Sequence, residues 1–179
     1  MINSQEDIRL PLINAINRTP WYWLFIVFVG SGLEAGALYY QYIVGDEPCV
    51  LCIHVRIWVA AFMLVGLIGL ISYRSETARL ASNILTIITA AGLTERSWQT
   101  LATEKGWAES SCAMDAGLPS WFDLERWFPA VFQVRDSCGF TPYIIGQITM
   151  AEFLLVIAGA SLLVTGLMTL SQIIAYKQS

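Results

Sequence analysis

Charged residues are scarce in this 179-residue chain: they make up 13% of it, roughly half their usual share in a soluble domain. Lysine and arginine together number only ten and form no basic stripe, which excludes the electrostatic footprint of a nucleic-acid-binding protein. Histidine occurs once and cysteine four times. Hydrophobic residues account for 56% of the chain, with seven tryptophans among them. This composition indicates a membrane protein.

The apolar residues gather in four long stretches, and the first has no small-residue cleavage site before it, so we expect it to be retained as a membrane span. A helix needs roughly 20 residues to cross a hydrocarbon core of about 30 Å, and a helix satisfies its own backbone groups inside a bilayer. We predict an all-α membrane protein, a single domain over residues 1–179 with a bundle of four transmembrane helices. The expected spans are residues 21–44, 50–73, 78–101 and 143–174. The third is the least apolar, because Asn83, Glu95 and Arg96 lie within it.

The connection over residues 102–142 is too long for a simple turn, which indicates that it has a role of its own. Part of it alternates aromatic and charged residues. We expect a short helix that lies in the membrane interface or packs as a lid on the bundle. Its apolar side would consist of Trp121, Phe122, Leu124, Trp127 and Phe128.

Several polar or small residues interrupt the first span. Gly32 and Gly36 form a small-xxx-small step, which favours close packing of helices. We expect Glu34 to pair with Arg96 or with a polar group of the bundle, or to stay protonated, because an isolated charge in a membrane is costly. Gln41 lies on nearly the same face and suits a hydrogen bond between helices.

Basic residues are distributed unevenly between the connections. The two tails and the second connection carry five of them, whereas the first connection and residues 102–142 carry three. By the positive-inside rule, both termini are expected in the cytoplasm. All four cysteines then lie on the opposite side of the membrane, where disulfides form and persist.

The cysteines allow three interpretations. Cys49 and Cys52 form a Cys-x-x-Cys at the start of the second span, and Cys112 and Cys138 lie in the long connection. They could form two structural disulfides, or a zinc site, although zinc sites more often use two closely spaced pairs. The third interpretation is redox catalysis, because the N-terminus of a helix stabilises a reactive thiolate. We favour this third interpretation.

Arg56 strengthens the redox interpretation. Cys49, Cys52 and Arg56 follow the spacing i, i+3, i+7, so they share one face of the helix. An arginine near the membrane boundary indicates a functional site. It suits stabilisation of a thiolate on Cys52 and a hydrogen bond to a carbonyl of a ligand. The alternative is an arginine that extends to the interface without a chemical role.

The chain resembles the bacterial disulfide bond formation protein B (DsbB) family. The resemblance covers nearly all of the chain after residue 20 and lies in LEAGALYYQ, EPCVLCIHVR, ERSWQ and the stretch from Cys112 through WFDLERWFPAVFQVRDS to Cys138. It implies an enzyme of the bacterial inner membrane that reoxidises a periplasmic thioredoxin-fold dithiol oxidase of the DsbA type. The electrons would pass to a membrane quinone, ubiquinone or menaquinone.

The resemblance also implies a role for each site residue. The partner's thiolate would attack Cys112, and Cys138 would leave and pass electrons on by attacking Cys49. Cys52 would then be the thiolate that faces the quinone, with Arg56 as the quinone-binding residue. Two alternatives remain open, a quinone-linked enzyme of the vitamin K epoxide reductase type and a membrane scaffold with two structural disulfides. In the first of these families the Cys-x-x-Cys usually comes near the last helix, whereas here it opens the second span.

Overall fold

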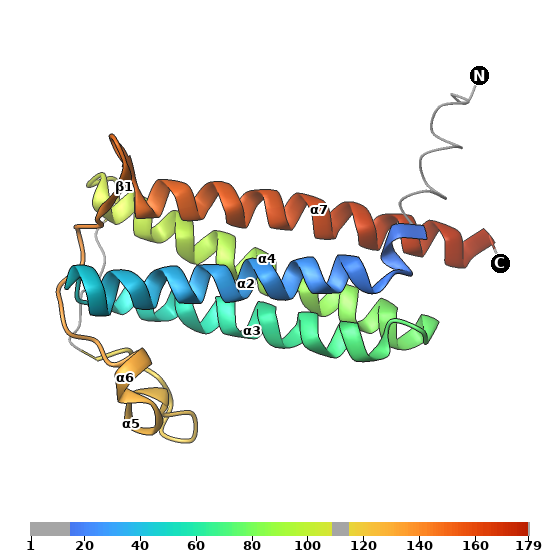
Figure 1. The fold of residues 1–179 in the computed structure, drawn as a ribbon, viewed down its shortest axis with the longest axis horizontal. Helices are drawn as coiled ribbons and strands as arrows, with labels where there is room; N and C mark the ends of the chain where they lie inside the picture. Colours follow the sequence, from blue (N-terminus) through green and yellow to red (C-terminus); the bar gives the residue numbers. More distant parts are fainter. Residues whose placement is uncertain (1–14, 109–114, 179) are drawn as a thin grey trace.

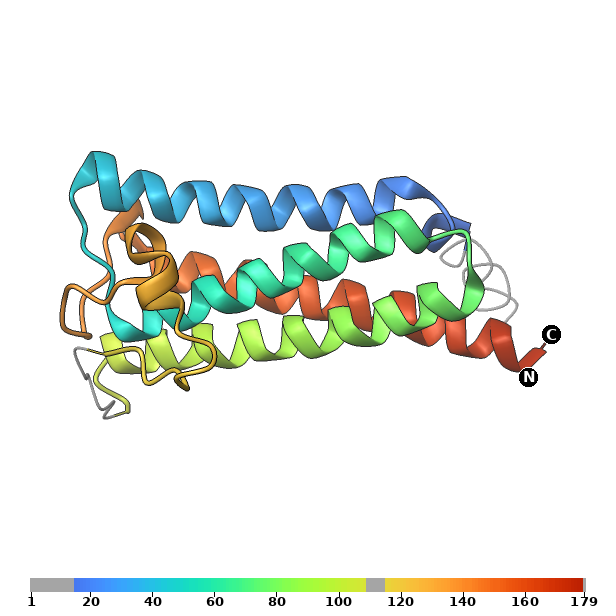
Figure 2. The same ribbon diagram turned by 90° about the horizontal axis from the view of Figure 1, so that it is seen from below.

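A computed structural model describes residues 15–108 and 115–178 of the chain. Four long helices run side by side along its length (Figure 1). They are α2 (Pro20–Tyr39) with its continuation as the π-helix η1 (Tyr40–Val44), α3 (Val50–Ser72), α4 (Glu76–Glu104) and α7 (Met150–Gln178). Helix α4 packs against both α3 and α7, and α2 packs against α3. A view at right angles shows α2 and α4 on opposite sides of the bundle (Figure 2).

The outer surface of the bundle is apolar, as a membrane requires. Within the described residues, three helices are long and apolar enough to cross a membrane: Pro20–Val44, Val50–Ser72 and Met150–Ala175. Large hydrophobic side chains point outward from each, among them Phe28, Ile71 and Leu163. The chain is therefore a helical membrane protein.

Helix α4 is the exception, because its sequence is more polar than that of the other three. Several of its polar side chains lie inside the bundle, among them Ser82, Asn83, Thr86 and Ser97, while Ile84, Leu85 and Ile88 face outward. Asn83 is completely buried and donates to Gln172 Oε1 of α7 at 2.6 Å and to Asn17 Oδ1 at 3.1 Å. These hydrogen bonds join α4, α7 and the turn before α2. Four transmembrane helices remain a prediction, which this inward polarity supports.

Helix α7 begins at Met150, whereas the sequence predicted a span from residue 143. Residues before it form a small hairpin of β1 (Tyr143–Ile145) and β2 (Ile148–Thr149), with Tyr143 opposite Thr149. Gly146 turns the chain with a φ of 60°. Thr149 then starts α7 with a capping box: its N–H donates to Glu152 Oε2 at 3.2 Å, and the Glu152 N–H donates to Thr149 Oγ1 at 3.3 Å.

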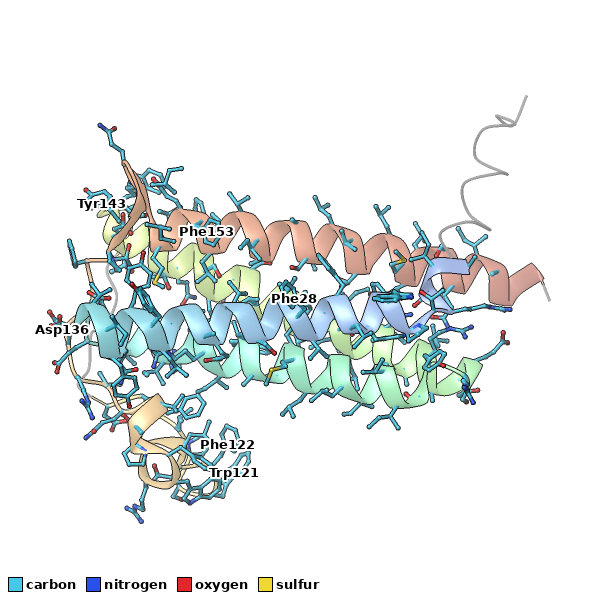
Figure 3. The ribbon with its side chains drawn as sticks, in the orientation of Figure 1. Phe28, Trp121, Phe122, Asp136, Tyr143 and Phe153 are labelled. Carbon is cyan, nitrogen blue, oxygen red and sulfur yellow. The ribbon has the colours of Figure 1, made fainter. Side chains whose placement is uncertain are left out.

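The expected interfacial helix is instead two single-turn helices, α5 (Leu124–Trp127) and α6 (Pro129–Phe132). Pro129 has no N–H to continue α5, so the first helix ends before it. Asp123 caps α5 by accepting a hydrogen bond from the Arg126 N–H at 3.1 Å. Figure 3 shows Trp121 and Phe122 on the side of this segment that points along the bundle, away from the end that carries Asp136. Trp121 is 76% exposed.

Close helix packing occurs at other glycines than the two predicted. A Cβ on Gly32 or Gly36 would meet nothing within 4 Å, so this step does not hold two helices together. A Cβ on Gly69 would clash with the Trp23 ring, and one on Gly92 would lie 2.6 Å from Trp58. Glycine is needed where a bulky side chain of the facing helix packs against it. The spacing of small residues in one helix does not reveal that side chain.

Candidate redox site

Cys49 occupies the N-cap of α3, where the extended chain enters the helix. Its Sγ accepts a hydrogen bond from the Cys52 N–H at 3.3 Å, one of the helix N–H groups that no backbone carbonyl can reach. The Sγ atoms of Cys49 and Cys52 lie 2.7 Å apart. The two sulfurs need only a small approach to form a disulfide, whose S–S bond measures about 2.0 Å.

The two sulfurs differ in their protonation. A hydrogen bond to the Cys52 side chain, together with burial, raises the pKa of the Cys49 thiol. Cys49 is 4% exposed, so solvent does little to stabilise a negative charge on it. The raised pKa favours the protonated form of Cys49, whose Sγ is hydrogen-bonded to that of Cys52. The role of Cys52 as the reacting thiolate remains a prediction.

The segment that carries Cys138 lies against the start of α3. The carbonyl of Pro48 accepts a hydrogen bond from the Arg135 N–H at 3.0 Å, and Cys49 forms a parallel β-bridge with Asp136. Figure 3 shows Asp136 at this end of the bundle. The side chain of Cys138 packs on the same apolar cluster as Cys49 and forms a hydrogen bond with it. Three of the four predicted cysteines are therefore neighbours.

Cys112 lies outside the described residues. The described chain resumes at Asp115, and Ala116 belongs to the buried cluster around Cys49. Glu125 links both sides of the long connection, because its carboxylate accepts from the Ala116 N–H at 3.1 Å and from the Val134 N–H at 3.2 Å. The sequence did not single out Glu125. Its carboxylate holds the chain at Ala116 and the chain at Val134 close together.

Arg56 is 5% exposed and binds the protein on three sides. Its Nη1 donates to Gln41 Oε1 at 2.6 Å and to the Val131 carbonyl at 2.7 Å, and its Nη2 donates to the Ala37 carbonyl at 3.1 Å. These three hydrogen bonds hold the Arg56 guanidinium inside the protein. It joins α3 to the end of α2 and to α6, and two of the five N–H donors of its guanidinium are left for a ligand.

Gln41 completes this contact. It sits in η1, where the wider π-helical turn brings it toward α3, and its Nε2 donates to the Ala130 carbonyl at 3.2 Å. The Tyr42 hydroxyl donates to the same carbonyl at 2.5 Å. The predicted role of Gln41 as a hydrogen-bonding link between helices is confirmed, and the link extends to α6.

A cavity of about 270 Å³ lies beside the cysteine pair. Its wall is mostly apolar, and side chains of α2, α3 and α7 contribute to it. The ionisable side chains in the wall are those of Glu34, Tyr40, Asp46, Cys52 and Arg56. Gly32 and Gly36 also line it, so these glycines leave space at the cavity instead of packing helices together.

A second cavity, of about 470 Å³, continues along the bundle between α2 and α7. It shares Gly32, Leu33 and Phe153 with the first, and its remaining wall is almost wholly apolar. Phe28 and Phe153 are both labelled in Figure 3 on the two helices that border it. The two cavities are therefore neighbours, and Cys52 lines the first of them.

The acidic residues of the site depart from expectation. Glu34 does not pair with Arg96: its Oε1 is buried with no hydrogen-bond partner among the described residues, and it faces the first cavity. Arg96 pairs with its neighbour Glu95 at 3.2 Å. Asp46, which the sequence did not single out, lies close to Asp136. Burial, followed by the charge of Asp136, raises the pKa of the Asp46 carboxyl, although Arg56 opposes this.

His54, the only histidine, shares in holding the connection. Its Nε2 lies 2.9 Å from the carbonyl of Ala116, so it donates a hydrogen bond there. This hydrogen bond joins Ala116, which follows Cys112 closely in the sequence, to the N-terminal part of α3.

Comparisons with known proteins match the chain over most of its length. The family model described as "DsbB: Disulfide bond formation protein DsbB" matches residues 18–168. A protein named "Disulfide bond formation protein B" from Photorhabdus laumondii is 30% identical over 156 residues, which cover 87% of this chain and 92% of that protein. The protein of the same name from Shewanella denitrificans is 30% identical over 75% of this chain and 77% of its own length. "Disulfide bond formation protein B 2" from Pseudomonas aeruginosa is 33% identical over 66% of this chain and 71% of its own length.

Proposed function

Because the chain belongs to the DsbB family of disulfide bond formation proteins, we propose that it is a membrane oxidoreductase that generates disulfides and passes the electrons to a membrane quinone. One observation carries this proposal: Cys52 lines an apolar cavity on one side, while Cys49 contacts Cys138 on the other. Cys49 and Cys52 thus lie between Cys138 and the cavity. Electron transfer by disulfide exchange to a ligand needs this arrangement.

The route has four sulfur atoms in order. A thiolate of the partner attacks Cys112 in the Cys112–Cys138 disulfide, which forms a mixed disulfide and releases Cys138. A second partner thiolate then resolves the mixed disulfide, which leaves Cys112 and Cys138 reduced and the partner oxidised. The Cys138 thiolate attacks Cys49 of the Cys49–Cys52 disulfide, and exchange with Cys112 restores the first disulfide. Two electrons then reside on Cys49 and Cys52.

The contact between Cys138 and Cys49 supports the transfer between the two pairs, because exchange requires one sulfur to reach the other. The position of Cys112 in this route is carried over from the family. The partner that we propose is a periplasmic thioredoxin-fold dithiol oxidase of the DsbA type.

The cavity beside Cys52 fits a quinone. A quinone ring is flat and mainly apolar, and its two carbonyl oxygens accept hydrogen bonds; when bound it supplies a sink for two electrons and two protons. The wall matches these properties: it is largely apolar, Arg56 offers N–H donors, and the carboxyl of Glu34 has an oxygen without a partner. Open space at Gly32 and Gly36 leaves room for a ring. The apolar space between α2 and α7 suits an isoprenoid tail.

The membrane arrangement is part of the proposal. The start of α2, the α3–α4 turn and the end of α7 lie at one end of the bundle, opposite the cysteines (Figure 1). Arg18, Arg74 and Arg79 lie at that first end, which the positive-inside rule assigns to the cytoplasm. We propose four transmembrane helices in the bacterial inner membrane, with the cysteines on the periplasmic side.

Absorbance spectroscopy of the purified protein in lipid nanodiscs tests this function directly. A reduced thioredoxin-fold dithiol oxidase and a short-chain ubiquinone or menaquinone are added, and quinone reduction is followed by its ultraviolet absorbance. We expect multiple turnovers, together with a long-wavelength band from contact of the Cys52 thiolate with the quinone. The band should disappear in Cys52→Ser. Intact disulfides without any quinone reduction would instead indicate a scaffold.

A further inference from the structure

Glu34 is the one ionisable side chain that α2 presents to the first cavity. Its position in the middle of a membrane span is costly for a charged group. Its Oε1 is buried and has no hydrogen-bond partner among the described residues, although Arg56 lines the same cavity. Arg56 directs its donors to Gln41 and to two backbone carbonyls instead. Glu34 as a whole is half-buried, and a buried carboxyl oxygen without a protein partner is free to contact a ligand in the cavity.

The reaction at this cavity needs an acid. When Cys49 and Cys52 form a disulfide, they release two electrons and two protons, and the reduction of a quinone to a quinol consumes both. Arg56 cannot serve as the acid, because a guanidinium does not lose its proton in proteins. Cys52 lines the cavity and Cys49 does not, so the Cys49 thiol does not meet the ligand directly. The electrons and at least one proton therefore reach the ligand through different groups.

We infer that Glu34 is the proton donor of the quinone site and hands its carboxyl proton to the quinone oxygen that faces α2. This inference rests on the proposed function. Glu34 regains a proton from those that the dithiol releases, so over one turnover two thiols and a quinone become a disulfide and a quinol, and Glu34 is unchanged. Atoms and electrons balance without any further reactant.

The surroundings of Glu34 suit this role. Arg56 and Cys52 of α3, Asp46 of the connection before α3 and Tyr40 of η1 line the same cavity as Glu34. The α7 part of the wall is apolar, with Ala151, Phe153 and Leu154. Apolar surroundings favour the protonated carboxyl, while Arg56 favours the carboxylate, so both states are accessible during turnover.

The test compares Glu34→Gln with Glu34→Asp, and with Glu95→Gln as the matched control. Glu34→Gln keeps the shape of the side chain and removes its acidic proton. Glu95 is an exposed helix carboxylate that is paired with Arg96 and does not line the cavity. Quinone binding to the disulfide form is measured by quenching of tryptophan fluorescence, and quinol formation is measured in a single turnover of the reduced protein across pH.

We expect Glu34→Gln to slow quinol formation about 100-fold, the size of a typical general-acid contribution, while quinone binding changes by less than about twofold. In the native protein the rate should fall as the pH rises and Glu34 loses its proton, and this fall should be absent in Glu34→Gln. Glu34→Asp should restore both the rate and its pH dependence in part. The exchange of Cys112–Cys138 with the dithiol partner should be unchanged in every variant.

Infrared difference spectra give a readout that needs no turnover. Addition of quinone to the oxidised native protein should shift a carboxylic acid C=O band that is missing in Glu34→Gln. An unchanged rate in Glu34→Gln, a parallel loss of binding and rate, or no rescue by Glu34→Asp would each overturn the proton-donor role. If the native protein itself reduces no quinone, the proposed function fails. If the native protein reduces quinone and the Glu34 variants reduce it equally fast, the inference alone fails.

Discussion

Arg56 of α3 and Gln41 of η1 are joined by a hydrogen bond of 2.6 Å, and both side chains also hold backbone carbonyls of α6, at Val131 and Ala130. One buried pair therefore fixes three segments: the end of the first span, the start of the second and the chain that leads to Cys138. The residue proposed to bind the quinone also helps to position the proposed disulfide relay.

Replacement of Arg56 by lysine should weaken both functions of this pair. Lysine is a point charge and cannot reproduce the planar fork that contacts Gln41 and two carbonyls. We expect quinone KM to rise about tenfold or more and unfolding stability to fall by about 1.5–3 kcal/mol, the range for a hydrogen bond to a charged group. Steady-state kinetics and thermal denaturation measure these two effects. Arg96→Lys, on a partly exposed arginine paired with Glu95, serves as the control; equal losses in both variants would contradict a specific role for Arg56.

Removal of single cysteines should separate the two pairs. Cys→Ser at Cys49, Cys52, Cys112 or Cys138 should abolish turnover of quinone with the dithiol partner, because each sulfur carries one step of exchange. The double variant that lacks Cys112 and Cys138 should still form the long-wavelength band with quinone, since Cys49 and Cys52 remain. Full turnover in that double variant would show that electrons bypass the outer pair.

Enlargement of Gly36 should close the first cavity without harm to the bundle. A Cβ at this position meets nothing within 4 Å, so Gly36→Leu adds its side chain to open space in the wall. We expect quinone affinity to fall about tenfold or more while the melting temperature stays nearly unchanged. Gly159→Leu is the control, because that glycine of α7 has equal space and lies outside both cavities. Equal quinone affinity in the two variants would exclude this cavity as the binding site.

Asp46 should make stability depend on pH. The folded state raises the pKa of its carboxyl through burial and the charge of Asp136. The carboxyl is therefore neutral and harmless at low pH, and its ionisation costs stability as the pH rises through the folded pKa. Asp46→Asn should melt at a higher temperature than the native protein near about pH 7, and at the same temperature near about pH 3.5, below the unfolded value of about 3.9. The exposed neighbour variant Glu47→Gln should show no such difference, and a melting curve of Asp46→Asn that follows the native protein at both pH values would refute the prediction.

Hydropathy and cysteine spacing predicted the features that depend on local sequence. The apolar stretches mark three helices of membrane-spanning length, and the face shared by Cys49, Cys52 and Arg56 follows from the helical period. The cavity that contains Cys52 and Arg56 depends on how α2, α3 and α7 meet, so the spacing of residues did not reveal it.

The incorrect predictions share a physical cause. Gly32 and Gly36 have the spacing of a packing step, but no side chain of a facing helix reaches them. Glu34 was expected to find a partner, and Arg56, its nearest candidate in the cavity wall, binds Gln41 instead. In both cases the outcome depends on a residue distant in the sequence. A local pattern records which groups are available and leaves open which group each one meets.

The buried amides and hydroxyls of α4 bear on how the protein reaches its folded state in the bilayer. A segment this polar gains little from entering lipid alone, since each unsatisfied amide or hydroxyl costs free energy there. This polar stripe becomes tolerable once Gln172 of α7 and Asn17, which precedes α2, accept the hydrogen bonds that Asn83 donates. If α4 is the fourth span that we propose, it should enter the membrane together with the strongly apolar α3 and become stable only when α7 supplies Gln172. Assembly of the bundle would then be completed by its last helix.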